Sequence, residues 1–314
     1  MATGRKVGSG GQRKRGLAGR GPTPKAEDRA YHKPYRSKSN GSSGPGSQPA
    51  KNNPNRSRAQ GKSAGADWVV GRNPVLEAMT AGLPIKAAYV AEGAERDDRL
   101  RDIFRYAAEH SISLLQSTRA ELDRLTGGAV HQGVALQLPG YEYAHPNDLI
   151  ADAVNDQTRA GLLVALDGIT DPHNLGAIVR SAAAFGAHGV IIPERRSASV
   201  TAVAWKSSAG ALARMPVAKA TNLNRVLQDA AKAGFTVVGL AGEAANDIAG
   251  VPGVDGPVLL VVGSEGAGLA RLTRERCDVL ARIPIASEVE SLNASVAASI
   301  SLYEVARCRG DMAD

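Results

Sequence analysis

The residues that could do chemistry begin where the apolar run 162–166 ends. Asn174 follows this run and Arg180 comes six residues later, nearly two turns inside the helix predicted over 174–185. Few acids lie near Arg180 in the sequence, so it is either an ordinary surface group or is directed at a phosphate or a sugar hydroxyl. His173 suggests a Ser-His-Asp hydrolase, but no serine elbow accompanies it, and the sequence disfavours that function.

A glycine-rich segment, Gly263–Gly268, follows the apolar run 258–262. Glycines directly after a strand usually let the backbone approach a ligand closely. The spacing matches neither the dinucleotide-binding fingerprint nor the P-loop, which needs a lysine that this segment lacks. Glu265 would also repel a pyrophosphate, whereas it suits a hydroxyl donor, a cationic ligand or a backbone amide. The segment therefore disfavours nucleoside triphosphates as ligands.

A third segment combines Ile283-Pro284 with the polar residues Ser291 and Asn293. Serine and asparagine are common first residues of helices, so their ordinary interpretation is a cap for the helix predicted over 293–307. That helix begins with small residues, which permit close packing against another backbone. Taken alone, none of the three segments names a reaction.

The elements that must position these segments alternate between strands and helices. From about Gly161 onward, apolar runs predict strands and the stretches between them predict helices. This alternation predicts a parallel-sheet α/β domain, with ligands at the carboxyl ends of its strands. The predicted strands are 162–166, 189–192, 236–240, 258–262 and 281–285, and the predicted helices are 174–185, 203–211, 222–233 and 293–307.

The same alternation over 68–140 predicts a smaller α/β unit. It consists of a strand and a helix within 68–81, strands at 87–91, 112–115 and 134–138, and helices at 97–110 and 119–126. His131-Gln132-Gly133 precedes the last of these strands and could contact a ligand, although such a sequence is more often a turn. The chain is thus expected to divide into a tail (1–66), a small domain (67–140), a linker (141–158) and a larger domain (159–314).

The segment 1–66 differs from the rest of the chain in charge. It holds 15 Lys and Arg against two acids, whereas the remaining 248 residues hold 23 against 29. Rich in Gly, Pro and Ser, with almost no large aliphatic side chains, it cannot offset its ordering entropy and is expected to be disordered. Its basic clusters and Tyr31 and Tyr35 suit a non-specific RNA-binding arm, although a solubilising extension also fits.

Composition excludes several classes of protein. The two cysteines, Cys277 and Cys308, are too few for a disulfide scaffold and lack a metal-ligand spacing. No apolar run approaches the roughly 20 residues of a membrane span, and the basic N-terminus lacks the apolar core of a signal peptide. We expect a cytoplasmic protein without a metal or a membrane partner.

Together, in this order and spacing, the three segments resemble the SpoU family of RNA ribose 2′-O-methyltransferases, within the SPOUT superfamily. The first motif of the family matches Asn174 and Arg180, and the second matches Gly263–Gly266. The third motif matches Ile283-Pro284 followed by Ser291–Ala297. The resemblance therefore assigns one activity to segments that individually suggested none.

This resemblance implies a fold, a substrate and a cofactor. The fold is a parallel-sheet domain with a C-terminal trefoil knot, in which S-adenosylmethionine binds, and the enzyme is a homodimer with its active site near the subunit interface. The implied cofactor contacts are Gly242, Gly263, Ile283 and Leu292. Residues 68–140 resemble the small ribosomal-protein-like RNA-binding domain of the branch that methylates guanosine in 23S rRNA.

The resemblance also implies the catalytic residues. A ribose 2′-hydroxyl is a poor nucleophile until its proton is removed or its developing charge is stabilised, and Arg180 is the residue implied for that task. Because a free guanidinium stays protonated, we expect Arg180 to hold the adjacent phosphate and to stabilise the alkoxide. Asn174, Glu265, Ser291 and Asn293 would orient the arginine, the ribose and the methyl donor.

One position departs from the family pattern. Ser287, within the acidic segment 286–290, stands where the family commonly has glycine. The backbone of this loop is therefore expected to depart from the path usual in the family. The small domain favours 23S rRNA as substrate, with a tRNA ribose 2′-O-methyltransferase as the alternative. A non-catalytic RNA-binding or ribosome-assembly protein is disfavoured by the intact Arg180, Glu265 and Asn293. The sequence identifies neither the target nucleotide nor its base.

Overall fold

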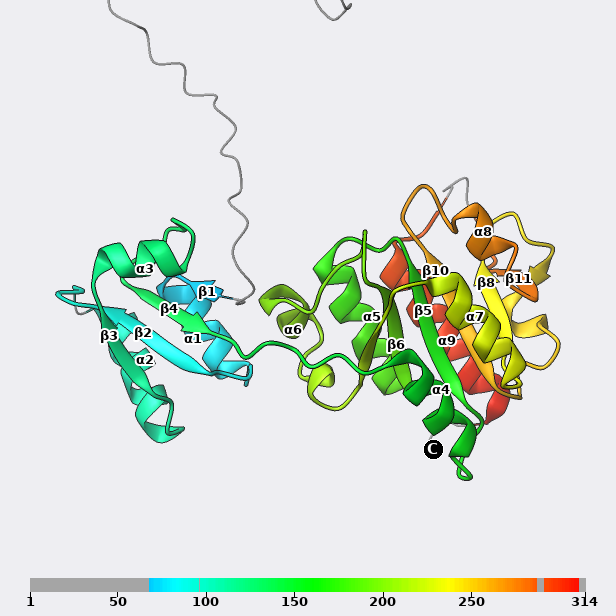
Figure 1. The fold of residues 1–314 in the computed structure, drawn as a ribbon, viewed down its shortest axis with the longest axis horizontal. Coiled ribbons are helices and arrows are strands. Elements are labelled where there is room, and N and C mark those ends of the chain that lie inside the picture. Colours follow the sequence, from blue (N-terminus) through cyan, green and yellow to red (C-terminus); the bar gives the residue numbers. More distant parts are fainter. Residues whose placement is uncertain (1–67, 96, 287–290, 311–314) are drawn as a thin grey trace, which may run out of the picture. The chain divides into compact units, whose positions relative to one another are not determined.

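The computed structural model describes residues 68–95, 97–286 and 291–310. The basic segment 1–66 lies outside the described residues, as do Ser287 and its neighbours 288–290, so the expectations about them stay predictions. The described chain forms two sheets, one of four strands and one of seven (Figure 1).

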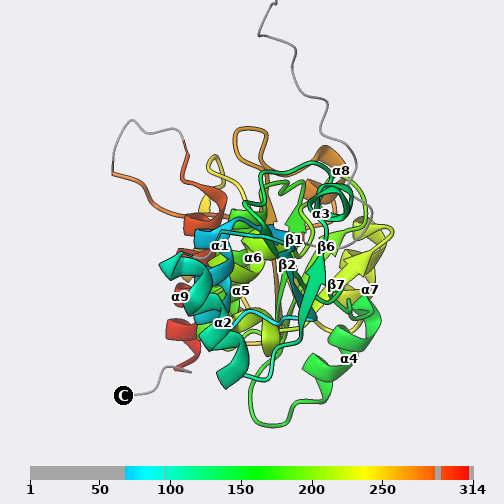
Figure 2. The same ribbon diagram turned by 90° about the vertical axis from the view of Figure 1, so that its left-hand side faces the viewer.

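The four-stranded sheet and the helices packed on it are named the small domain here. Strand order is β1-β4-β2-β3, with β2 and β3 parallel and the other pairs antiparallel. Helices α1 and α2 cover one face of the sheet, and α3 covers the other through Leu122 (Figure 2). The elements are β1 (Trp68–Val70), α1 (Arg72–Thr80), β2 (Ala87–Ala91), α2 (Asp98–Glu109), β3 (Leu114–Ser117), α3 (Arg119–Leu125) and β4 (Val134–Gln137).

The seven-stranded sheet belongs to the large domain. Its order is β7-β6-β5-β10-β8-β11-β9, and every paired strand is parallel to its neighbour. The strands are β5 (Leu162–Asp167), β6 (Gly189–Pro193), β7 (Val217–Ala220), β8 (Thr236–Leu240), β9 (Asn246–Asp247), β10 (Val258–Gly263) and β11 (Val279–Arg282). The helices are α4 (Pro146–Asn155), α5 (Pro172–Ala184), α6 (Ala202–Ser207), α7 (Leu223–Lys232), α8 (Arg271–Arg274) and α9 (Ala294–Arg309), with short 3₁₀ turns η2 (Ala211–Ala213) and η3 (Ile248–Gly250).

Helices cover both faces of this sheet, which explains why its central strands are almost wholly apolar. Along β5, Leu162 and Val164 face the core formed with α5 and α9, whereas Leu163 and Ala165 face the core formed with α4 and α7 (Figure 1). Residues of β5 pair one to one with those of β10, so the two buried strands end together. The parallel sheet predicted from the sequence is therefore present, and both segments that follow its central strands emerge at one edge.

Several predicted bounds were wrong for identifiable reasons. The strand expected at 112–115 is β3, two residues later, because the Ile112 amide donates to Ala107 and ends α2. The helix expected over 203–211 stops at Ser207, since Ala209 and Gly210 take positive φ angles of 47° and 83°.

Other differences reflect proline or short length. The strand expected at 281–285 is β11, which ends at Arg282 shortly before Pro284, a residue without an amide hydrogen for the ladder. Helix α5 begins at Pro172, earlier than expected, because the Asp171 side chain accepts from the His173 amide and proline suits the first helical position. The sequence did not predict β7, β9 or α8, which have four residues or fewer.

Candidate active site

A cavity of about 520 Å³ lies at the carboxyl ends of β8, β10 and β11, and we call it the strand-end cavity. Three loops from three strands meet there because the strands are parallel. Its lining includes all four residues implied as cofactor contacts, together with two of the implied catalytic residues. These are Gly242 after β8, Gly263 and Glu265 at the end of β10, and Ile283, Ser291 and Leu292 after β11.

The glycine-rich segment is a tight hairpin that forms one wall of the cavity. The Ser264 amide donates to the Gly268 carbonyl over 3.1 Å, and the Gly268 amide donates back over 2.9 Å. A Cβ at Gly263 would overlap the backbone of Gly268, so glycine is required there by the hairpin itself. A Cβ at Gly242 would instead meet nothing within 4 Å. Of these two glycines, only Gly242 leaves open space that a larger side chain would fill.

Glu265 joins three segments that are distant in the sequence. Its Oε1 accepts a hydrogen bond from Asn174 Nδ2 at 2.9 Å and another from Asn293 Nδ2 at 2.6 Å. The Ala294 amide also points at this oxygen, at 3.4 Å. Asn293 Nδ2 lies 3.0 Å from Asn174 Oδ1 as well, which closes a three-residue cluster. The structure thus brings together Asn174, Glu265 and Asn293, one from each of the three segments.

Asn293 serves both as helix cap and as a member of this cluster. Its Oδ1 accepts from the Ser295 and Val296 amides at the start of α9, at 2.8 and 3.3 Å. Its Nδ2 remains free for Asn174 and Glu265. The two interpretations left open by the sequence are therefore compatible, because they use opposite ends of one amide.

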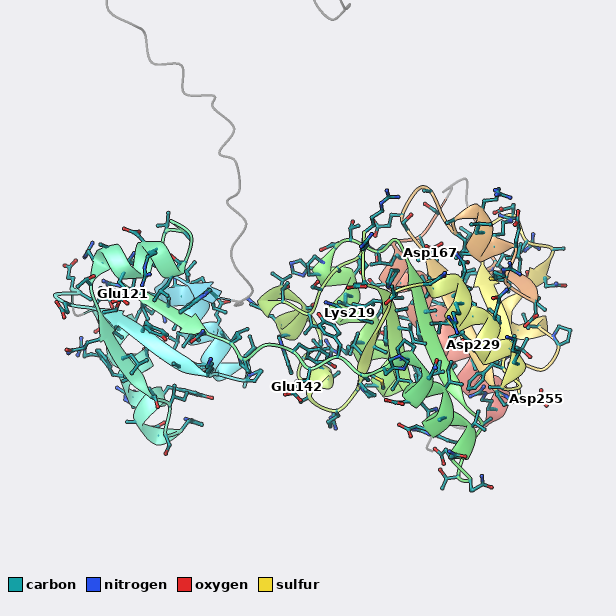
Figure 3. All side chains as sticks on the ribbon, in the orientation of Figure 1. Glu121, Glu142, Asp167, Lys219, Asp229 and Asp255 are labelled. Atoms are coloured by element: carbon teal, nitrogen blue, oxygen red, sulfur yellow. The ribbon has the colours of Figure 1, made fainter. Side chains whose placement is uncertain are left out.

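Asn174 is held in place by the packing of α5. It lies in the first turn of that helix and is only 8% exposed. A buried side-chain amide must form hydrogen bonds within the protein, and Glu265 and Asn293 provide them. Two positions along, a Cβ at Gly176 would overlap the Ala204 carbonyl of α6, so glycine permits this close helix contact. At the carboxyl end of β5, Asp167 Oδ2 accepts from the Ala270 amide at 2.7 Å and anchors the chain after the hairpin (Figure 3).

Arg180 is the one implied catalytic residue that the structure leaves apart from the others. It is exposed, is not part of the cavity lining, and forms no hydrogen bond or ion pair with any residue that the structure describes. The next residue, Ser181, places its Oγ 2.6 Å from Ser299 Oγ of α9. Arg180 therefore lies beside the line of contact between α5 and α9, and no described acid pairs with its charge.

Three charged residues of the cavity, Glu243, Arg274 and Arg282, were missed by sequence reasoning. Glu243 follows Gly242, and Arg274 of α8 forms an ion pair with it across the lining. The hydrogen bond from Arg274 keeps the pKa of the Glu243 carboxyl below its usual range. Glu243 lies three residues after the end of the predicted strand 236–240, which was the available signal, whereas nothing local to Arg274 indicates its partner.

Other chemistries find no support in the described part of the chain. Burial raises the pKa of the Cys277 thiol to about 12, so it is not a ready nucleophile. His173 is exposed at the start of α5. No group of three or more His, Cys, Asp or Glu that could hold a metal ion occurs among residues 68–95, 97–286 and 291–310. Within those ranges, no helix is long and apolar enough to span a bilayer.

A parallel α/β domain whose loops enclose a cavity beside a carboxylate–amide cluster defines a ligand-binding α/β enzyme. Comparison with known proteins makes the class specific. The SpoU rRNA Methylase family model matches residues 161–303, and a model for RNA 2′-O ribose methyltransferase substrate binding matches residues 68–144. The chain belongs to the SpoU family of RNA methyltransferases.

Similar proteins are found over nearly the whole chain. An uncharacterized tRNA/rRNA methyltransferase of Mycobacterium ulcerans (strain Agy99) is 54% identical over 308 residues, which cover 98% of this chain and 94% of the relative. Among solved structures, the SpoU methyltransferase AviRb from Streptomyces viridochromogenes, in complex with AdoMet, is 27% identical with a TM-score of 0.56. That similarity covers 80% of this chain and 92% of AviRb. An AdoMet-bound rRNA methyltransferase from Sinorhizobium meliloti is 25% identical with a TM-score of 0.53, covering 77% and 87%.

Proposed function

We propose that this protein transfers a methyl group from S-adenosylmethionine to a ribose 2′-hydroxyl of RNA, with a guanosine of 23S rRNA as the favoured target. The observation that carries this proposal is the cluster of Asn174, Glu265 and Asn293 beside the strand-end cavity. Family membership supports RNA methylation in general. The substrate-binding family model over 68–144 supports the ribose as acceptor.

The strand-end cavity fits S-adenosylmethionine in size and lining. Its volume of about 520 Å³ is within the range of small-molecule sites. Gly242 leaves open space at its wall, and the loop backbones offer amides and carbonyls without intervening side chains. Apolar side chains such as Ile283 and Leu292 can contact an adenine, while the pair of Glu243 and Arg274 offers both charges. When bound there, the cofactor supplies an electrophilic methyl group on a sulfonium sulfur.

The chain's own residues would activate and orient the ribose. Oε1 of Glu265 is engaged by Asn174 and Asn293, whereas Oε2 makes no hydrogen bond with a described residue and can accept from a ribose hydroxyl. Ser291, in the cavity lining, can donate to the ribose or its phosphate. Arg180 would hold the phosphate and stabilise the negative charge that develops on the 2′-oxygen. The amides of Asn174 and Asn293 would thus orient Glu265, and the exposed Arg180 would supply the positive charge.

A homodimer would explain the position of Arg180. Val296, Ile300 and Tyr303 form one stripe on α9 and are 44%, 38% and 42% exposed. Apolar stripes of this kind commonly cover a partner, and Arg180 lies beside the same helix. We therefore propose that two copies associate through α9 and that Arg180 acts at the subunit interface. Light scattering of the full chain gives the mass that tests this association.

The remaining features of the proposal come from the sequence, and among them the trefoil knot rests on the family resemblance. They are a trefoil knot at the C-terminal end, a cytoplasmic location, and a division into a small RNA-binding domain, a linker (141–158) and a catalytic domain, with α4 of the linker packed on the sheet of the catalytic domain. The sheet order β10-β8-β11 supports the knot, because the third motif then returns to the hairpin that follows β10.

Methyl transfer from labelled S-adenosylmethionine to unmodified 23S rRNA and to tRNA tests the reaction. A 2′-O-methyl group blocks alkaline cleavage of the adjoining linkage, so the expected product contains one alkali-resistant dinucleotide carrying the label. Label on a base would refute ribose methylation, and label in tRNA alone would identify the alternative substrate. An absence of transfer together with an absence of cofactor binding by calorimetry would support the non-catalytic alternative.

A further inference from the structure

The small domain has a cavity of its own, of about 530 Å³, which we call the arginine cavity. All of its lining residues belong to the small domain, so it is independent of the strand-end cavity. They come from the starts of α1, α2 and α3 and from the turn before β4. The lining consists of Arg72, Asn73, Glu95, Asp97, Arg99, Arg119 and Gln132.

One side of this cavity is held by hydrogen bonds and is electrically balanced. Arg72 Nη1 lies 2.5 Å from Asp97 Oδ2, so these two charges compensate each other. Arg72 Nε donates to the Gln132 carbonyl at 3.2 Å, and the Arg72 amide donates to Gln132 Oε1 at 3.1 Å. Gln132 holds a φ of 52°, which is uncommon for a residue other than glycine. Backbone strain of this kind is concentrated at binding sites, where the surrounding structure maintains it.

The other arginines of α2 and α3 show why the cavity is unusual. Arg101, Arg105 and Arg124 lie outside it, and each forms an ion pair with an acid three residues before it on its own helix. Arg99 and Arg119 line the cavity, and neither forms an ion pair or a hydrogen bond with a residue that the structure describes. The two helices therefore leave unpaired only the guanidinium groups that face this hollow.

We propose that the arginine cavity binds a backbone phosphate of the RNA substrate through Arg99 and Arg119. Guanidinium groups bind phosphate with paired hydrogen bonds, and two of them in the lining of one cavity can hold one nucleotide. Glu95 would repel a free anion, but its carboxylate can accept from a ribose hydroxyl, which a nucleotide carries beside its phosphate. Asn73 and Gln132 add amides for the same nucleotide. The proposal rests on the proposed function for the identity of the ligand as RNA.

The test compares two double variants of the full chain that lose equal charge from the same two helices. Arg99→Ala/Arg119→Ala removes the cavity pair, and Arg101→Ala/Arg124→Ala is the matched control outside it. Binding of unmodified 23S rRNA is measured from 50 to 300 mM salt, a range of about sixfold chosen to give a slope. The cavity variant is expected to bind about tenfold to hundredfold more weakly, with a salt slope smaller by about one to two. The control is expected to change affinity less than about threefold.

Two results would overturn the proposal. Equal weakening by both variants would mean that RNA senses only the net charge, and unchanged binding by the cavity variant would exclude the site. Thermal unfolding verifies that each variant folds. If alanine lowers the melting temperature, Arg99→Gln/Arg119→Gln, which keeps long polar side chains at these exposed positions, provides the same comparison.

The result is separable from the proposed function. RNA binding is measured without cofactor, so the comparison of the two double variants does not depend on methyl transfer. Failure of the wild-type chain to methylate RNA would refute the proposed function and leave the binding comparison valid. Equal binding by both double variants would refute the arginine cavity while methyl transfer stands.

Discussion

The two cavities have almost the same volume, about 520 and 530 Å³, but opposite linings. The strand-end cavity is lined mainly by loop backbone and by small or apolar residues, with four charged side chains among them, those of Glu243, Glu265, Arg274 and Arg282. The arginine cavity is lined almost entirely by long charged or polar side chains. The first lining suits one compact ligand recognised by shape, and the second suits a charged polymer.

Sheet topology accounts for this difference. In the large domain all paired strands are parallel, so their carboxyl ends, and the loops after them, converge at one edge. The small domain has a mixed sheet, so its strands end at both edges and no comparable set of loops converges. Its cavity is formed instead where three helices begin, and there side chains rather than backbone supply the chemistry.

The largest expected effect concerns Arg180, which belongs to neither lining. Arg180→Ala is expected to slow methyl transfer about 100- to 1000-fold, because a charge-stabilising group is lost, while cofactor affinity and fold are retained. Arg180→Lys is expected to rescue poorly, since an ammonium lacks the planar fork of donors. Single-turnover transfer with saturating enzyme separates the chemical step from binding. A fully active alanine variant would remove Arg180 from the mechanism.

Asn293 tests whether the cluster has a function beyond capping α9. Asn293→Ala is expected to lower methyl transfer about 10- to 100-fold, by removing donors to Glu265, and to lower the free energy of unfolding by about 1 kcal/mol. The control is Asn222→Ala, because Asn222 caps α7 away from the cavity and accepts from the Arg225 amide at 3.2 Å. It is expected to lose similar stability with normal activity. Equal loss of activity in Asn293→Ala and Asn222→Ala would show that Asn293 only caps α9 and has no separate role in methyl transfer.

Gly242 tests whether the strand-end cavity holds the cofactor. Gly242→Val adds a side chain where open space now lies, and we expect it to weaken cofactor binding about tenfold, which corresponds to about 1.4 kcal/mol. Gly250→Val is the matched control, since a Cβ at Gly250 also meets nothing within 4 Å and lies outside the lining. Calorimetry measures cofactor affinity, and RNA binding should be unchanged. Normal affinity in Gly242→Val would place the cofactor elsewhere.

The smallest expected effect concerns a carboxylate at the opposite edge of the sheet. Asp156 accepts hydrogen bonds from Thr158 and from His188 Nε2, and these keep its pKa below the usual value. His188 Nδ1 in turn accepts from the Leu162 amide at the start of β5. The carboxylate therefore stabilises the fold above about pH 4, its unfolded pKa. That contribution is lost as pH falls through the folded pKa.

Asp156→Asn should thus melt at a lower temperature than wild type at pH 7, and the difference should shrink as pH is lowered below about 4. Methyl transfer at pH 7 is expected to be normal, in contrast to variants of Glu265 at the carboxyl edge. Melting curves at several pH values measure the first expectation. A constant difference at all pH values would show that Asp156 acts through packing and not through its charge.

Local sequence signals were sufficient to predict most helices and strands and to single out Asn174, Glu265 and Asn293 as candidate site residues. Apolar runs located β5 and β10, whereas the cap at Asp171 with Pro172, which begins α5 two residues before the predicted start, was overlooked. Short edge strands such as β7 escaped prediction, because four residues give too little periodicity to distinguish a strand from a loop.

What the sequence by itself determined was the set of chemical groups and their order along the chain. The spacing of Asn174, Glu265 and Asn293 indicated a family, but these residues are separated by 91 and 28 positions, and only the parallel sheet brings them within hydrogen-bond distance. Tertiary structure alone decided that Arg180 lies apart from this cluster, and that Arg99 and Arg119 line one cavity without an ion pair to any residue that the structure describes. The physical reason is that sequence spacing fixes the direction in which a side chain leaves its own helix. Whether that side chain meets an ion-pair partner or lines a cavity depends on which other helices and strands pack beside that helix.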